Sequence, residues 1–416
     1  MGKTIIEKII QAHSRESVSA GKTVWMDLDL RSARDFGGPN VVRNYQKEYG
    51  ETPVENPRKT YFTFDLCAPA CSIKYADSQQ VCRQFARKQN IRVYDVDRGI
   101  GSHILVEEGL SFPGSTAVGT DSHMNILGAV GCFGQGMGDV DITFAFKTGK
   151  TWFEVPSTIK VIVKGNFQFP ATPKDLTLYI LKQTGTRKAG LKAVEFYGEA
   201  VESLTFSGRM TLCSMVTEMA GIIGFIPGTN KIFQEEMNKF FGSDFMFPQP
   251  DADASYEDCL TIDVDGLPPQ IAAPFSPENV GDAASFKDVS IDSGFIGSCT
   301  NGRAEDIMGA ARILKGRKIK HGIMLKIVPA TREVYGILLE KGVLEDLFQC
   351  GAIVSQPGCG GCAEGHIGLT GEGEVQISTG NRNFPGKQGK GKTYLASPEV
   401  VAASCLAGKI RTPEDL

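Results

Sequence analysis

Tyr61-Phe62-Thr63-Phe64-Asp65 and Ile91-Arg92-Val93-Tyr94-Asp95 are two short apolar segments, each ending on a carboxylate. Runs rich in aromatic and β-branched residues are typical of strands. Residues 77–90 between them predict a helix, and residues 24–30 alternate apolar and polar side chains as a strand does. Strands that alternate with helices predict an α/β protein with a largely parallel sheet.

The chain is too long, at 416 residues, for one ordinary core. A strand at 158–164 opens a second unit, and prolines between residues 268 and 277 indicate a linker that runs to about residue 285. We therefore predict three α/β domains, at residues 1–157, 158–285 and 286–416. The other predicted elements are helices at 4–20, 176–184, 210–221, 304–315 and 331–341, and strands at 287–297, 323–328 and 351–355.

The composition is that of a soluble globular protein, with 41% hydrophobic and 22% charged residues. A net charge of −4 argues against nucleic acid or an anionic membrane as the main partner. The N-terminus is charged and amphipathic, and no run of ~18 apolar residues occurs. Eleven scattered cysteines favour a reducing cytoplasm, with most thiols in the core. Cys67-x-x-x-Cys71 has no third cysteine at C-x-x-C spacing, so we expect that pair to be structural.

Cys359-Gly360-Gly361-Cys362 is the strongest single motif in the chain, and Cys299 within Gly-Ser-Cys-Thr-Asn-Gly is its natural companion. Glycines allow positive φ and a close wrap around an inorganic group. Two thiolates at this spacing can ligate neighbouring irons of a cluster or form half of a zinc site. A thioredoxin-like redox pair or a simple glycine turn is also compatible with the motif.

Two histidines and an aspartate are predicted to lie in loops at strand ends: His103, and then Asp121 and His123 within Gly-Thr-Asp-Ser-His. Parallel α/β sheets collect their catalytic groups at such loops. Glu218 lies among apolar residues of a predicted helix, where a carboxylate needs a partner.

Two glycine-rich stretches resemble nucleotide-binding loops in sequence. Residues 128–138 do not spell G-x-G-x-x-G and follow no strand directly, so we interpret these glycines as close helix packing. Residues 386–393 match the Walker A pattern, but Asn-Phe-Pro precedes them and the next helix is expected to start at Ser397-Pro398. We predict an anion-binding or solvated loop there and no ATP site.

Four motifs in order resemble those of the aconitase superfamily, in particular the group of 3-isopropylmalate dehydratase and archaeal homoaconitase large subunits. The resemblance covers about residues 25–405, and the motifs read Gly-Thr-Asp121-Ser122-His123, Gly-Ser-Cys299-Thr-Asn-Gly, Gly-Cys359-Gly-Gly-Cys362 and Asn381-Arg382-Asn383-Phe384.

The resemblance implies a [4Fe-4S] cluster held by Cys299, Cys359 and Cys362, with one iron left open as a Lewis acid. It implies a hydro-lyase that dehydrates and rehydrates a 2-hydroxy di- or tricarboxylic acid such as 3-isopropylmalate. Homocitrate or homoaconitate, citramalate and 2,3-dimethylmalate are alternative substrates.

The resemblance also assigns roles to single residues. Asp121 would orient His103, and Glu218 would orient His123, each carboxylate fixing a tautomer. Arg382 would bind a substrate carboxylate with a planar fork, and Ser122 would donate a hydrogen bond to substrate. The remaining site residues that it implies are Asp65 among the catalytic groups, and Arg34 and Lys387 among the substrate-binding groups.

Several positions depart from the family pattern. Leu66 stands where the family has the histidine that protonates the departing hydroxyl, and loss of a general acid typically costs ~10²–10⁴ in rate. Lys387 replaces an arginine, Ser214 an asparagine, and Arg34-Asp35 a His-Asp or Gln-Asp pair. These changes keep open a non-hydratase or cluster-sensing member of the same fold. A zinc or thiol enzyme that uses only Cys359 and Cys362 is a further alternative.

The family's deprotonating serine lies in a Gly-Ser-Ser-Arg-Glu segment on a swivelling fourth domain, and these 416 residues contain no such segment. We therefore expect a three-domain aconitase-like fold that needs a separate small subunit to supply the serine base. On this view the isolated chain is nearly inactive.

Overall fold

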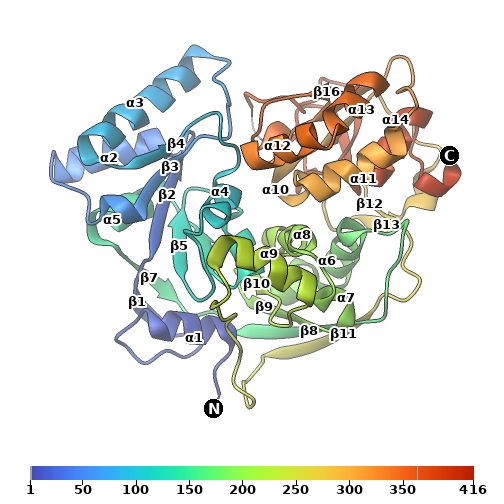
Figure 1. Cartoon of the computed structure of the whole chain (residues 1–416). Helices are drawn as coiled ribbons and strands as arrows, with labels where there is room; N and C mark the ends of the chain where they lie inside the picture. Colours follow the sequence, from blue (N-terminus) through green and yellow to red (C-terminus); the bar gives the residue numbers. More distant parts are fainter. Residues whose placement is uncertain (1, 363) are drawn as a thin grey trace.

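The computed structural model describes residues 2–362 and 364–416 of the chain. Their strands form one small antiparallel sheet and three larger sheets. Figure 1 shows the three larger sheets as separate lobes, blue at the upper left, green below and orange to red at the upper right. Parallel pairing dominates all three, as the alternation of strands and helices predicts.

The first sheet is entirely parallel, in the order β4-β3-β2-β5-β6. Its strands are β2 (Leu30–Arg34), β3 (Thr60–Thr63), β4 (Arg92–Tyr94), β5 (Thr116–Gly119) and β6 (Phe133–Gly136). The helices around it are α2 (Gly38–Tyr49), η1 (Pro57–Lys59), α3 (Ile73–Gln89), α4 (Gly101–Glu107), η2 (Met124–Val130) and α5 (Asp139–Thr148). His103 therefore lies on helix α4, and not in a loop as predicted.

The N-terminal segment is more broken than predicted. Helix α1 (Ile5–Ala12) ends well before residue 20. At its end, the His13 ring donates from Nδ1 to Ile9 O (2.8 Å) and from Nε2 to Asp29 Oδ2 (2.8 Å). The predicted strand 24–30 is split at Asp29, whose carboxylate also accepts from the Thr116 N–H at 3.1 Å. Strand β1 (Thr23–Asp27) before the break pairs antiparallel with β7 (Lys150–Glu154).

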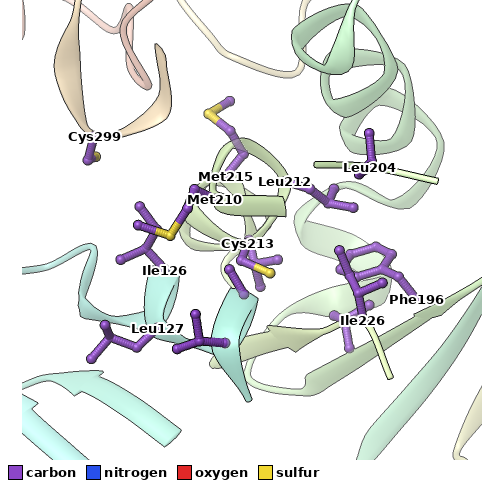
Figure 2. Close-up of a cluster of buried hydrophobic side chains, with 14 of the residues drawn as sticks. Ile126, Leu127, Phe196, Leu204, Met210, Leu212, Cys213, Met215, Ile226 and Cys299 are labelled. Atoms are coloured by element: carbon purple, nitrogen blue, oxygen red, sulfur yellow. The ribbon is translucent and has the colours of Figure 1, made fainter. Parts of the chain in front are cut away.

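The second sheet is also parallel, in the order β10-β9-β8-β11. Its strands are β8 (Thr158–Lys164), β9 (Ala193–Tyr197), β10 (Ile223–Phe225) and β11 (Asp258–Asp263), and its helices are α6 (Pro173–Ala189), α7 (Glu199–Glu202), α8 (Phe206–Met215), η3 (Val216–Met219) and α9 (Lys231–Phe241). Figure 2 shows α8 packing Met210 and Cys213 towards Ile126 and Leu127 of η2, with Cys299 at the edge of the same cluster. The core is thus shared between elements from all parts of the chain.

The third sheet has the order β13-β12-β18-β17-β14-β15-β16, in which β12 pairs antiparallel with both of its neighbours and the remaining pairs are parallel. Its strands are β12 (Gln270–Ala272), β13 (Val280–Asp282), β14 (Ser293–Ile296), β15 (Met324–Ile327), β16 (Ile353–Val354), β17 (Val375–Ser378) and β18 (Lys392–Leu395). The helices are η4 (Ala283–Phe286), α10 (Ser298–Asn301), α11 (Ala304–Leu314), α12 (Arg332–Glu340), α13 (Val343–Cys350), η5 (Gly360–Cys362), α14 (Pro398–Ala407) and η6 (Pro413–Asp415).

The predicted proline-marked linker is wrong over residues 270–282, because these residues form β12 and β13 at the edge of the third sheet. The Gln270 N–H donates to the buried Asp175 Oδ1 at 2.7 Å, which anchors β12 next to α6. Division of the chain at residues 157 and 285 stays a prediction.

The close packing expected of the first glycine-rich stretch is confirmed at Gly128, and the second stretch lacks the geometry of a P-loop; anion binding by residues 386–393 stays a prediction. A Cβ on Gly128 would lie 2.0 Å from Gly224 O, so that glycine permits close packing of η2 on β10. Lys392 begins strand β18, whereas a P-loop would begin a helix there. Helix α14 instead follows Ser397, with Pro398 as its first residue. No helix in the described part of the chain is long and apolar enough to cross a membrane.

Candidate active site

The site residues lie just beyond the carboxyl ends of parallel strands from two sheets. Arg34 ends β2, Asp65 follows β3 and Asp121 follows β5 in the first sheet. Cys299 follows β14 and Cys359 follows β16 in the third sheet. Ligands of open α/β sheets bind in the crevice at such ends, so this topology concentrates the polar side chains in one place.

A cavity of about 410 Å³ lies where these strand ends meet. Eight of the predicted site residues line it: Arg34, Asp121, Ser122, His123, Cys299, Cys359, Cys362 and Lys387. Three others contact residues of the lining: Asp65 contacts Arg34, His103 contacts the Cys299 carbonyl, and Glu218 contacts His123. The fourth, Arg382, is bonded to Glu218. The structure therefore brings the predicted set together.

The three cysteines line the cavity; Cys299 and Cys359 are buried and Cys362 is partly buried. Cys359 Sγ accepts from Arg34 Nη2 at 2.8 Å, and Cys299 Sγ accepts from Asn381 Nδ2 at 3.4 Å. Burial raises the pKa of the Cys299 thiol to about 12 and raises the pKa values of Cys359 and Cys362 as well. Thiolates at these positions therefore require additional positive charge, which a metal group would supply if bound there.

Gly360 allows the loop between Cys359 and Cys362 to pack tightly. Its φ is +62°, and a Cβ there would lie 2.4 Å from the Phe295 ring. A Cβ on Gly361 would lie 2.7 Å from Gly368 O. Any larger residue would displace the chain that carries both thiols.

Arg34 joins the two sheets. Its Nε donates to Asp65 Oδ1 at 2.7 Å and its Nη1 donates to Asp121 Oδ1 at 2.9 Å, while Nη2 reaches Cys359. Burial alone would raise the pKa of Asp121, but the Arg34 guanidinium and His123 hold it below its ordinary value. Burial raises the pKa of Asp65 to about 7 despite the pull of Arg34. One guanidinium thus compensates two buried carboxyl groups.

His123 and Glu218 form the histidine–carboxylate contact that was expected. His123 Nε2 lies 2.9 Å from Glu218 Oε1, which fixes the ring and leaves Nδ1 as its second hydrogen-bonding nitrogen. Arg382 Nε donates to Glu218 Oε1 and Oε2, at 2.8 and 3.0 Å. Burial opposes ionisation of Glu218, yet these two partners lower its pKa. Because Nε of Arg382 is engaged with Glu218, only its Nη atoms remain for a ligand.

His103 is held differently from the expectation. Its Nε2 lies 3.0 Å from the Cys299 carbonyl oxygen, and Arg303 Nη1 lies 3.4 Å from its Nδ1. A carbonyl accepts and a guanidinium donates, so the proton sits on Nε2. Burial and the Arg303 cation lower the pKa of His103 to about 3, which makes the ring neutral. The hydrogen bonds of Asp121 within the described residues go to Arg34 and the His123 N–H, and not to His103 as expected.

Comparison with known proteins agrees with this geometry. The sequence model of the aconitase family (aconitate hydratase) matches residues 7–285 and 279–408.

The chain belongs to the aconitase family.

Two curated relatives illustrate the relationship. The 3-isopropylmalate dehydratase large subunit 1 of Methanopyrus kandleri is 41% identical over 416 residues, which cover 99% of each chain. The homoaconitase large subunit of Thermus thermophilus is 38% identical over all of this chain and 98% of its own. The crystal structure of Thermococcus kodakaraensis aconitase X shares the fold, with a TM-score of 0.52 and 15% identity over 86% of this chain and 84% of that one.

Aconitase-family enzymes generally use an iron–sulfur cluster, and the donor set here fits one. Three thiols from two loops line one cavity, next to the cations Arg34 and Lys387. Within the residues that the structure describes, no three His, Cys, Asp or Glu side chains gather closely enough to hold a single metal ion. Thiolates that line one cavity can each bind a different iron of a polynuclear cluster.

Leu66 faces this aconitase-family cavity where a proton donor was expected. Its N–H donates to Asp35 Oδ1 at 3.2 Å, so the backbone is fixed and the apolar side chain lines the wall. Asp65 is not positioned to replace it, because its Oδ1 accepts from Arg34 and its Oδ2 accepts from the Gly101 N–H at 2.9 Å.

Sequence reasoning missed several residues of the site. Phe36, Tyr75 and Glu364 line the cavity, and Arg303 contacts His103. Lys174 is completely buried and donates from Nζ to the carbonyls of Thr379 (2.9 Å) and Gly380 (3.0 Å), next to Asn381. Only Tyr75 carried a signal, since it starts a helix soon after Asp65. The Lys174 environment arises from tertiary packing alone.

Proposed function

We propose that the chain is the large subunit of an aconitase-family hydro-lyase, which dehydrates and rehydrates a 2-hydroxy di- or tricarboxylic acid. The cavity that brings three cysteine thiols together with Arg34, Lys387 and the His123–Glu218 pair is the observation that carries this proposal. The names of relatives at about 40% identity over the full length support the same reaction class.

In this proposal Cys299, Cys359 and Cys362 hold a [4Fe-4S] cluster. When bound, such a cluster with one open iron supplies a Lewis acid for the hydroxyl and carboxylate of the substrate. The Arg34 guanidinium adjoins Cys359 and keeps positive charge beside the sulfur atoms. His103 anchors the Cys299 main chain through its Nε2–H.

The positively charged side chains at the cavity favour a substrate that carries negative charge. Lys387 lines the cavity as a point charge, and Ser122 presents a hydroxyl beside it. The Nη atoms of Arg382 are available for a carboxylate, since its Nε is bonded to Glu218. A substrate with two or three carboxylates matches this distribution of donors.

His123 is the proton-transfer group that the geometry favours. Glu218 engages its Nε2, so Nδ1 takes or returns a proton at the cavity.

With Leu66 in place of the family histidine, the cavity wall lacks an imidazole at that point. A substrate other than 3-isopropylmalate is therefore part of the proposal: homoaconitate, citramalate and 2,3-dimethylmalate belong in the first panel. A non-hydratase member of the fold is the second candidate, and Leu66 favours it.

A small-subunit partner that carries the serine base completes the proposed enzyme. Several relatives are named large subunits, which supports a heteromeric assembly. The cytoplasm is the proposed location.

The decisive experiment measures iron, sulfide and EPR spectra after anaerobic reconstitution, and then hydroxy-acid turnover with a small subunit added. We expect near four irons per chain, falling sharply in Cys299→Ser and unchanged in the matched control Cys259→Ser, an exposed cysteine on β11. Zinc, or iron that is indifferent to Cys299, would contradict the cluster. Full turnover by the large chain alone would contradict the need for a partner.

A further inference from the structure

Cys67 and Cys71 are adjacent thiols beside the active-site cavity. Their Sγ atoms lie 3.5 Å apart, and the Cys71 N–H donates to Cys67 Sγ at 3.1 Å. Cys67 is buried, whereas Cys71 is exposed. The expectation that this pair is structural does not account for an exposed thiol in contact with a buried one.

Cys71 faces a cavity through which small molecules can approach it. This cavity has a volume of about 760 Å³, and Cys71 forms part of its wall. Phe36, Tyr75 and Glu364 line both this cavity and the active-site cavity. The two cavities therefore adjoin, and a small oxidant in the outer one can contact Cys71.

The main chain of Cys67 is coupled to the active-site wall. Its N–H donates to Asp35 Oδ2 at 3.2 Å, and Asp35 Oδ1 accepts from the N–H groups of Leu66 at 3.2 Å and Asp65 at 3.3 Å. Gln79 Nε2 donates to Asp35 Oδ2 at 3.0 Å and to the Cys67 carbonyl at 2.8 Å. A displacement of Cys67 is thus transmitted to Leu66, which lines the active-site cavity.

We propose that Cys67 and Cys71 are a redox modification site that a hydroperoxide converts into a reversible intrachain disulfide. The exposed Cys71 thiolate attacks the terminal peroxide oxygen and the O–O bond breaks, giving a sulfenic acid and releasing water or an alcohol. The Cys67 sulfur then attacks the Cys71 sulfur, the S–S bond forms and a second water leaves. Two thiols are oxidised by two electrons and one peroxide is reduced.

The geometry requires little movement for this reaction. A disulfide has an S–S length of about 2.05 Å, so the sulfurs must approach by roughly 1.5 Å from their present contact. Intracellular disulfides are usually transient and regulatory, which fits a pair with one exposed thiol. The modification stands independently of the proposed function, whereas its effect on turnover rests on that function.

The test uses the full chain with its cluster loaded, treated with one equivalent of hydrogen peroxide and then alkylated. Trypsin releases residues 60–74, a peptide that contains both cysteines and no other. We expect most of this peptide to lose two hydrogen atoms and to resist alkylation, and dithiothreitol to restore two alkylated thiols. Cys71→Ser should abolish the disulfide, and the matched control Cys259→Ser should keep it.

Two results would overturn the proposal. One is a peptide 60–74 that stays doubly alkylated while Cys259, the other exposed cysteine of the described chain, becomes oxidised. The other is Cys71 oxidised to sulfinic acid while Cys67 stays reduced. Iron and sulfide are counted in the same samples, because peroxide damage to the cluster lowers turnover in Cys71→Ser as well. If dithiothreitol reverses a loss of turnover, and Cys71→Ser shows no such loss, the loss is caused by the disulfide.

Discussion

Replacement of Arg34 by methionine tests the charge arrangement on which the site depends. Arg34 is 8% exposed, and its partners Asp65 and Asp121 are 0% and 5% exposed. Removal of one partner of a buried ion pair typically costs about 3–5 kcal/mol, because an uncompensated charge remains buried. Here two carboxyl groups would lose their shared cation, so we expect a loss of at least about 3 kcal/mol in the first sheet.

Hydrogen exchange of the β2 and β3 amides measures this loss locally, which suits a chain of this size better than one global unfolding transition. A change of about 3 kcal/mol corresponds to roughly 100-fold faster exchange. The matched control is Arg332→Met, which breaks an exposed ion pair with Asp97. The two side chains of that pair lie 2.9 Å apart, as those of Arg34 and Asp121 do. That change should cost no more than about 1 kcal/mol.

The double variant Arg34→Met/Asp65→Asn makes the reasoning refutable. Asparagine removes one of the two buried carboxyl groups that lose their cation, so the double variant should regain part of the protection lost in Arg34→Met. The argument fails if Arg34→Met exchanges no faster than Arg332→Met. It also fails if Asp65→Asn slows exchange by the same factor in the unsubstituted chain and in Arg34→Met.

Three further predictions follow from single contacts. Burial raises the pKa of Glu399 from its ordinary 4.5 to about 8, so its contribution to stability is present below pH 4.5 and is lost as the pH rises through 8. Calorimetry should therefore show the Tm of Glu399→Gln, relative to the unsubstituted chain, increasing from pH 5 to pH 9, and a constant difference would contradict the assignment. Gly128→Ala should lower stability by about 1–3 kcal/mol, because its Cβ would meet Gly224 O, whereas Gly336→Ala on α12 meets nothing within 4 Å and should be neutral or mildly stabilising in urea unfolding. Leu66→His, assayed with the small subunit on malate-type hydroxy acids, should raise turnover about tenfold or more if the chain is a diverged hydratase; no gain over Leu66→Gln would favour the non-hydratase candidate.

The sequence predicts the parallel sheets well because local patterns control them. Short apolar segments such as residues 61–65 can be buried only as inner strands, and the polar residues that follow them must then share one edge. The cysteine motifs identify ligand types for the same reason, since few other arrangements use thiols among glycines. Here local chemistry and global position coincide.

Sequence patterns failed where tertiary packing decides the partner. The sequence predicted that Asp121 orients His103. In the folded chain β2 pairs with β5, and the guanidinium of Arg34 donates to Asp121 instead. The prolines around β12 suggested a linker, so this strand was not predicted. Asp175 on helix α6, which is distant in sequence, stabilises the strand. The burial of Lys174 also lies outside any local pattern, because its neighbours Thr172 and Asp175 are polar.

The shared core around α8 has a consequence for how the protein can be divided. All three predicted cluster ligands lie in residues 286–416, yet Cys299 and Cys359 belong to a core that also contains Leu66, Ile126 and Met210. The guanidinium that contacts Cys359 comes from β2. An excised C-terminal fragment would keep every thiol and lose the walls that keep water from them. Ligand identity is thus encoded in one segment, whereas protection of the bound group is a property of the intact chain.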